Sequence, residues 1–389
     1  MTDSRSFITR RQALELLAMT AAVAWPSATA AQQRGPEFPK GAVIRTLLKD
    51  YAPEELAGGA TLFHEHMSLG TDFNQRFTAA SAAARALNGP APAPLGTPPA
   101  APRAGGGGAA PAGGAAPGGG RGGGPAPAAG PNPMSDVSLM AKELVDARND
   151  GVACIVDAGH PDSGRDINFL RQASMMSGVP IVAGGGFYAQ PWYPKEISTM
   201  SENQIVDALI KQADDDTLGA WGEIGSWDEI SADERKVFRA IGRAHVATNL
   251  PIFTHTGIPG KSALEQLDLL EDAGVKPDRI VIGHLGNVVD ANVYLHKIVC
   301  RRGAYVGFDR QGGGGDANVV PMVMALLEAG YADHLMFSAD TMRGYGKTLT
   351  VFLPKLRAAG VSDDILHKIM VDNSRRWLAF VPKRARKRA

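Results

Sequence analysis

The stretch that decides the fold is Thr61-Leu62-Phe63-His64-Glu65-His66, a short apolar run that ends in two histidines separated by one residue. Side chains alternate along a β-strand, so His64 and His66 project to the same side if this stretch is extended. Two imidazoles on one face are a natural pair of ligands for zinc or a similar metal. Taken alone, the pair is equally compatible with packed or hydrogen-bonded histidines.

Four later apolar runs also end in side chains that can bind a metal, namely Glu223, His255, His284 and Asp340. Positions 223 and 255 are 32 residues apart, 255 and 284 are 29 apart, and 284 and 340 are 56 apart, which is about two further units. This is the spacing of a strand-plus-helix repeat. We expect strands at Thr61–His66, Ala153–Asp157, Pro180–Gly184, Leu218–Gly225, Pro251–His255, Arg279–His284, Ala304–Phe308 and His334–Asp340. Eight strands alternating with helices predict an α/β fold, a (β/α)8 or TIM barrel.

Catalytic groups of such barrels lie at the carboxyl ends of the strands, and all six candidates fall there. One histidine at a strand end could be an ordinary core residue, but His255 and His284 occupy matching positions. A carboxylate such as Asp340 at the end of a buried strand is costly unless it is paired or bound to a metal. We therefore interpret the six side chains as a two-metal hydrolytic centre, in which Asp340 can also take a proton from the attacking water.

Two divalent cations a few ångströms apart repel each other unless ligand charge lies between them. Glu223, in the motif Gly222-Glu223-Ile224-Gly225, is the expected bridge. No lysine lies between Lys211 and Lys236, so a carboxylated lysine cannot bridge the metals from this strand.

Residues 1–31 are expected to be a twin-arginine-type signal peptide. Arg10-Arg11 precedes an apolar run from Ala13 to Trp25, which is followed by the small residues 27–31. The run is too short for a membrane span and contains a glutamate, so we expect no stable membrane insertion. The mature chain would be periplasmic or secreted; an ordinary Sec signal is the alternative.

Residues 32–380 are expected to form the barrel, interrupted at 88–134 by a segment of Ala, Gly and Pro. This segment has almost no large apolar residues to bury, so we expect a disordered insertion in the first βα connection, either a mobile cover or a tolerated surface insertion. Residues 381–389 are a basic tail, expected to be solvated. The net charge is zero, which gives no general case for nucleic-acid binding. We expect Cys154 and Cys300 to be buried, unpaired thiols.

Several motifs together resemble the phosphotriesterase family of the amidohydrolase superfamily, from Gly58 to Phe380 outside the insertion. They are Thr61–His66, Gly164-Arg165-Asp166, Gly186-Phe187-Tyr188, Gly222–Gly225, Thr254-His255-Thr256, Gly283-His284 and Asn373–Phe380. The resemblance implies that His64, His66 and Asp340 hold one metal, that His255 and His284 hold the other, and that Glu223 and a hydroxide bridge them. This is the glutamate-bridged branch, whereas many members use a carboxylated lysine.

The resemblance also implies two divalent ions, Zn²⁺ first, with Mn²⁺, Co²⁺ or Fe²⁺ as alternatives, and it suggests a homodimer. Tyr188 and Arg310 resemble a tyrosine and an arginine that lactonase members place beside the metals, although a packed tyrosine and a surface arginine are the alternatives. Two features depart from the lactonases: Leu285-Gly286-Asn287 lacks the aspartate that many members carry, and the loop after Asp340 is short.

The leading hypothesis is a metal-dependent hydrolase whose bridging hydroxide cleaves a small-molecule lactone or other carboxyl ester, with phosphotriesters as a side activity. The alternatives are an N-acyl amide hydrolase and an exported metal-binding protein without turnover. Five further histidines are expected to lie at the surface or beside the ligands, with His160 able to face the site: His160, His245, His296, His334 and His367.

Overall fold

The computed structural model describes residues 35–88, 132–257 and 260–383. The chain separates into two units, Met1–Glu37 and Phe38–Ala389, and the second contains the fold considered below. The predicted signal peptide lies outside the described residues, as do most of the predicted insertion and most of the basic tail. At the edges of the predicted insertion, Asn88 is the last residue of a helix and Pro133 is the first residue of a 3₁₀ turn. No helix among the described residues is long and apolar enough to span a membrane.

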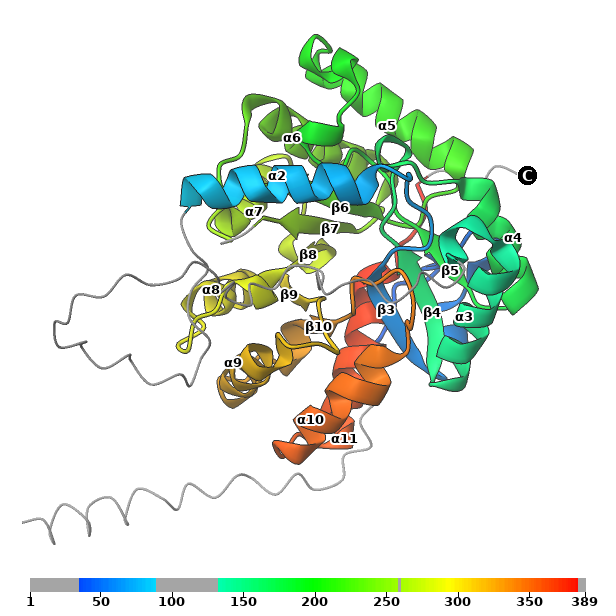
Figure 1. Cartoon of the computed structure of the whole chain (residues 1–389), viewed down its shortest axis with the longest axis vertical. Helices are drawn as coiled ribbons and strands as arrows, with labels where there is room; N and C mark the ends of the chain where they lie inside the picture. Colours follow the sequence, from blue (N-terminus) through cyan, green and yellow to red (C-terminus); the bar gives the residue numbers. More distant parts are fainter. Residues whose placement is uncertain (1–34, 89–131, 258–259, 384–389) are drawn as a thin grey trace, which may run out of the picture. The chain divides into compact units, whose positions relative to one another are not determined.

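The described part of Phe38–Ala389 forms a barrel of parallel strands with helices around it (Figure 1). Hydrogen bonds between neighbouring strands join them in two runs, one from β10 to β6 and one from β3 to β5. The eight strands are β3 (Ala60–Glu65), β4 (Val152–Asp157), β5 (Ile181–Ala183), β6 (Trp221–Ser226), β7 (Ile252–Thr256), β8 (Ile280–Ile282), β9 (Tyr305–Phe308) and β10 (Leu335–Phe337). All eight predicted strands are present, and the fold class is confirmed.

Backbone hydrogen bonds close the two remaining seams of the barrel. The Asp340 N–H donates to the His64 carbonyl at 3.1 Å, which joins the segment after β10 to β3. The Gly219 N–H donates to the Ala183 carbonyl at 3.0 Å, which joins β5 to the segment before β6. The carboxyl ends of all eight strands therefore meet on one face.

Helices follow the strands as the repeat predicts, and polar side chains begin several of them. Asp136 and Asp166 accept hydrogen bonds from backbone N–H groups in the first turns of α3 and α4, and Ser201 and Ser231 form capping boxes at α5 and α6. The helices between strands are α2 (Phe73–Asn88), α3 (Val137–Asn149), α4 (Ile167–Ser177), α5 (Glu202–Asp216), α6 (Ala232–Thr248), α7 (Ala263–Asp272), α8 (Tyr294–Arg302) and α9 (Asp316–Glu328). After β10 come α10 (Leu353–Ala358), α11 (Asp363–His367) and α12 (Ser374–Leu378).

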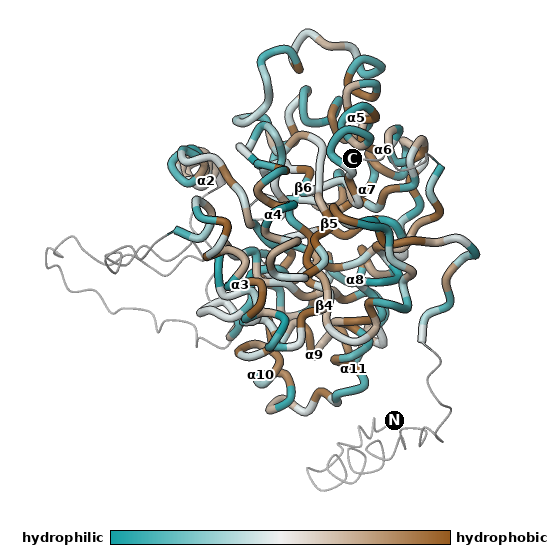
Figure 2. The backbone as a smooth tube through the Cα atoms, turned by 90° about the vertical axis from the view of Figure 1, so that its right-hand side faces the viewer, coloured by the Kyte–Doolittle hydropathy of each residue, from teal (hydrophilic) through white to brown (hydrophobic). Residues whose placement is uncertain are grey.

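Alternating strand residues build two layers of core. Phe63, Val156 and Phe253 belong to a cluster that also contains Trp377 of α12, whereas Leu62, Ile155 and Ile252 pack in the larger cluster with the surrounding helices. Figure 2 shows the resulting hydropathy pattern, with hydrophobic residues around β5 and stretches of hydrophilic residues on outer helices.

Both cysteines are buried and free, as predicted. They belong to different clusters, Cys154 to the one with Trp377 and Cys300 to the one with the surrounding helices.

Candidate metal centre

The structure brings all six predicted ligands together at the carboxyl face of the barrel. His64, Glu223 and His255 lie within strands β3, β6 and β7. The other three lie past the strands: His66 follows β3 by one residue, His284 follows β8 by two, and Asp340 follows β10 by three. The predicted strands at 279–284 and 334–340 are therefore too long. His284 and Asp340 have positive φ angles of 61° and 47°, which end the extended backbone before each ligand.

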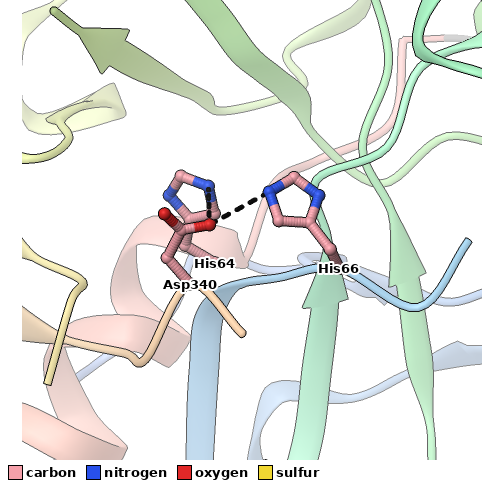
Figure 3. A group of neighbouring side chains, drawn as sticks. All are labelled: His64, His66 and Asp340. Atoms are coloured by element: carbon pink, nitrogen blue, oxygen red, sulfur yellow. Dashed lines mark ion pairs between the residues drawn. The ribbon is translucent and has the colours of Figure 1, made fainter. Parts of the chain in front are cut away.

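His64, His66 and Asp340 form one group of potential ligands (Figure 3). The Nε2 atom of His66 lies 3.1 Å from Asp340 Oδ1, and the Nε2 atom of His64 lies 3.8 Å from the same oxygen. The Asp340 side chain is 5% exposed, and both imidazoles are buried. Two nitrogens and one oxygen thus converge on one point away from bulk water.

Glu223, His255 and His284 form a second group. Glu223 Oε2 lies 2.9 Å from His255 Nδ1 and 3.3 Å from His284 Nε2. Glu223 also faces the first group, because its Oε2 and Oε1 atoms are each 3.2 Å from an imidazole nitrogen, of His64 and His66 respectively. The carboxylate predicted as a bridge therefore stands between the two groups.

Asp309 is a residue of the site that sequence reasoning missed. Its Oδ2 atom is 2.9 Å from His64 Nδ1 and its Oδ1 atom is 2.8 Å from His284 Nδ1, so one carboxylate accepts from a histidine of each group. A carboxylate only accepts, so both Nδ1 atoms donate to Asp309 and both Nε2 atoms face the centre. The signal was available, because Asp309 directly follows the predicted strand Ala304–Phe308.

Glu65 holds the backbone around Asp340. This buried carboxylate accepts from the Ser338 hydroxyl and from the N–H groups of Ala339 and Thr341, each at 2.8 Å. These bonds fix the backbone on both sides of Asp340, whose own φ is in the left-handed region. Glu65 therefore positions a candidate ligand from the opposite side of the barrel seam.

Tyr188 and Arg310 both contact the candidate ligands. The Tyr188 hydroxyl lies 3.1 Å from His255 Nδ1, and Arg310 donates from Nε to Asp340 Oδ2 at 3.0 Å. Tyr188 is buried, whereas the Arg310 side chain is 27% exposed. The tyrosine is thus packed and also reaches the centre, and the arginine is partly at the surface and paired with Asp340.

The five remaining histidines have structural contacts. His245, His296 and His334 each place a ring nitrogen near a backbone carbonyl, of Leu250, Leu285 and Ala304. Because His245 and His296 are buried, the predicted surface location is wrong for them. His367 lies at the surface, 3.9 Å from Asp372.

His160 stacks on Tyr188 with ring centroids 6.2 Å apart, so it lies beside a residue that touches the centre. Burial lowers the pKa of His160 to about 3, and the ring is neutral at physiological pH.

The donor set fits a divalent metal of intermediate softness. Histidine nitrogens and carboxylate oxygens are the ligands of zinc and its neighbours. His64 Nε2 is buried and lies 3.2 Å from Glu223 Oε2, but it makes no hydrogen bond of normal geometry to a described residue. Burial also lowers the pKa of His255 to about 4, so this imidazole keeps a lone pair for a metal at neutral pH. Burial opposes protonation of His66 too, but Asp340 and Glu223 raise its pKa to about 9.

The parallel barrel and the buried cluster on its carboxyl face define a metal-dependent hydrolase. The chain belongs to the phosphotriesterase family, whose model matches residues 51–378. It is therefore a hydrolase of ester or amide bonds, which confirms the predicted hydrolase and includes both the leading ester reading and its amide alternative.

Named relatives share part of the chain. The phosphotriesterase homology protein of Escherichia coli is 30% identical over 62% of this chain and 88% of its own length. The N-acetyltaurine hydrolase of Danio rerio is 25% identical over 63% of this chain and 78% of its own. A crystal structure of a lactonase from Listeria monocytogenes covers 86% of this chain and 98% of its own with a TM-score of 0.65, and at 22% identity this likeness shows the fold.

Replacing Asp309 by asparagine should weaken metal binding. Asparagine has one acceptor oxygen and a donating NH₂ group, so it cannot accept from both His64 and His284. We expect Zn²⁺ affinity to fall by roughly 10- to 100-fold, the usual effect of losing such a partner, in calorimetric titration of metal-stripped protein. Asp316→Asn is the control, because it also removes a buried, paired carboxylate but lies outside the centre. Equal losses in the two variants would contradict a specific role for Asp309.

Metal affinity should rise with pH. With a pKa of about 9, His66 is protonated at pH 7 in the metal-free protein, and a metal must displace that proton. Burial opposes protonation of His64, but Glu223 and Asp309 raise its pKa well above the ordinary value, so a metal must displace a proton there as well. The apparent affinity should therefore increase by more than about tenfold per pH unit below 9. Competition with a chromophoric chelator at pH 6, 7 and 8 measures this slope, and a flat profile would exclude the proton competition.

Proposed function

We propose that this hydrolase is binuclear and that a metal-bridging hydroxide cleaves a lactone or another small carboxyl ester, with phosphotriesters as a side activity. The observation that supports it is the position of Glu223, whose two oxygens face imidazoles of both groups. A carboxylate there supplies the negative charge that two adjacent cations require. In this proposal His64, His66 and Asp340 hold one metal, and His255 and His284 hold the other.

Two bound divalent ions would supply hydroxide near neutral pH and polarise the carbonyl under attack. The chain's own residues do the rest. Asp340, held by Glu65 and Arg310, accepts the proton of the attacking water. The partly exposed guanidinium of Arg310 can hold the carbonyl oxygen of the substrate, and the Tyr188 hydroxyl can orient the attacking water.

An N-acyl amide is the second candidate substrate. Relatives named N-acetyltaurine hydrolase match 63–64% of the chain at 25–26% identity, and the same centre can attack an amide carbonyl. Esters remain first because an alkoxide is a better leaving group than an amide anion, so ester cleavage depends less on a proton donor for the leaving atom. A metal-binding protein without turnover is the third reading.

The metal proposed for the centre is Zn²⁺, since four imidazoles favour it over Mg²⁺ or Ca²⁺; Mn²⁺, Co²⁺ and Fe²⁺ share the preference. A homodimer, and a small molecule rather than nucleic acid as the partner, stay proposals that follow from the family and from the zero net charge.

Replacing Asp340 by asparagine should strongly reduce turnover while leaving metal in the protein. We expect kcat to fall by roughly a hundredfold or more, because the proton acceptor is lost while an amide oxygen can still ligate. Initial rates on lactones, aryl esters, phosphotriesters and N-acyl amino compounds, with metal content by mass spectrometry, measure both effects. Asp316→Asn again serves as the control.

Two metals per chain and one preferred substrate class in the wild type would fix the reaction. If the fully metal-loaded protein hydrolyses none of these compounds, the result would favour a metal-binding protein without turnover. A single metal per chain would refute the binuclear proposal.

We propose that residues 1–31 direct export by the twin-arginine route, which carries folded proteins and so allows the metals to be bound before translocation. Replacing Arg10 and Arg11 together by lysine should stop export of a reporter fused to these residues, measured by cell fractionation. Unchanged export of the double variant would instead favour an ordinary Sec signal.

A further inference from the structure

Four aromatic side chains, termed here the aromatic cover, lie beside the metal centre: Phe73, Phe77, Trp192 and Trp227. Phe73 and Phe77 are one helical turn apart on α2, so they share a face. Their rings stack with centroids 6.0 Å apart. Phe73 is 5.4 Å from Trp192, and Phe77 is 6.0 Å from Trp227. Figure 1 shows α2 lying across the region of β6 and β7.

The aromatic cover touches the candidate ligands themselves. Phe77 and Trp227 meet the His255 ring edge-on, with centroids 6.0 and 5.8 Å away. Phe73 lies 6.3 Å from the His66 ring. His66 and His255 are each only 2% exposed, whereas Phe77 and Trp227 are partly exposed. These two rings therefore stand between a candidate ligand and solvent.

The side chain of Arg76 also connects α2 to the loop after β5. Arg76 donates to the Pro191 carbonyl at 2.7 Å, and its guanidinium lies 5.4 Å from the Trp192 ring centre. The helix is thus placed by Arg76 and by the rings. Asp340, by contrast, is contacted by the partly exposed and charged side chain of Arg310. The surroundings of the centre are therefore aromatic beside His255 and cationic beside Asp340.

We propose that the aromatic cover binds an apolar, preferably planar, part of the substrate, and that Phe77 determines this specificity. The inference rests on the proposed ester or amide hydrolysis and names its substrate class. A carbonyl placed between the two groups of ligands directs its oxygen toward the polar side near Arg310. The substituent on the His255 side then meets Phe77 and Trp227, where a ring gains from edge-to-face or offset-stacked contact.

The test compares methyl phenylacetate with methyl acetate, which share a leaving group and differ only in the acyl substituent. The metal-loaded full chain should hydrolyse the phenylacetyl ester with kcat/KM at least about tenfold higher. Phe77→Ala should remove most of that preference by slowing the phenylacetyl ester alone. Thr78→Ala, on the exposed side of α2, is the matched control and should leave the preference unchanged.

Equal losses on both esters in Phe77→Ala, or a wild-type chain without preference, would overturn the proposal. If the wild type hydrolyses neither ester, binding of phenylacetate and acetate, followed by tryptophan fluorescence, separates the two proposals. Tighter binding of phenylacetate that Phe77→Ala weakens would support the aromatic cover although the proposed hydrolysis fails. Equal binding of the two acids would refute the aromatic cover.

Discussion

The rest of the structure depends on the charge balance at the carboxyl end of the barrel, where four imidazoles and three carboxylates are buried together. Burial alone would raise the pKa of Glu223, of Asp309 and of Asp340, but the facing imidazoles lower all three. An isolated buried charge would be prohibitively costly, so each of these groups requires the others. The strands that carry them must therefore end at one level.

Different carboxylates fix different parts of this centre. Glu223 stands between the two groups of ligands, whereas Asp309 lies behind them and fixes one imidazole of each. Glu65 likewise fixes the backbone around Asp340 by accepting hydrogen bonds from the N–H groups on either side of it. These hydrogen bonds link β3, the residue that follows β9, and the segment after β10. The contacts that hold the barrel closed therefore also fix the geometry of the site.

The chain surrounds this polar centre unevenly. Phe77 and Trp227 lie against His255, whereas Arg310 lies against Asp340, so the centre has an aromatic side and a cationic side. The family fixes the class of chemistry, and in our proposal these surroundings select the substrate.

The sequence by itself determined the barrel and placed six candidate ligands at or just after strand ends: His64, His66, Glu223, His255, His284 and Asp340. Apolar runs and the spacing between them can be recognised along the sequence, and parallel strands bring their carboxyl ends to the same face. The sequence did not reveal that Asp309 joins two histidines or that Glu65 supports Asp340, since those contacts link residues up to 276 positions apart. The place of α2 over His255 was equally hidden. Only the closed barrel decides which loops converge, because its strand order and register bring distant segments to one face.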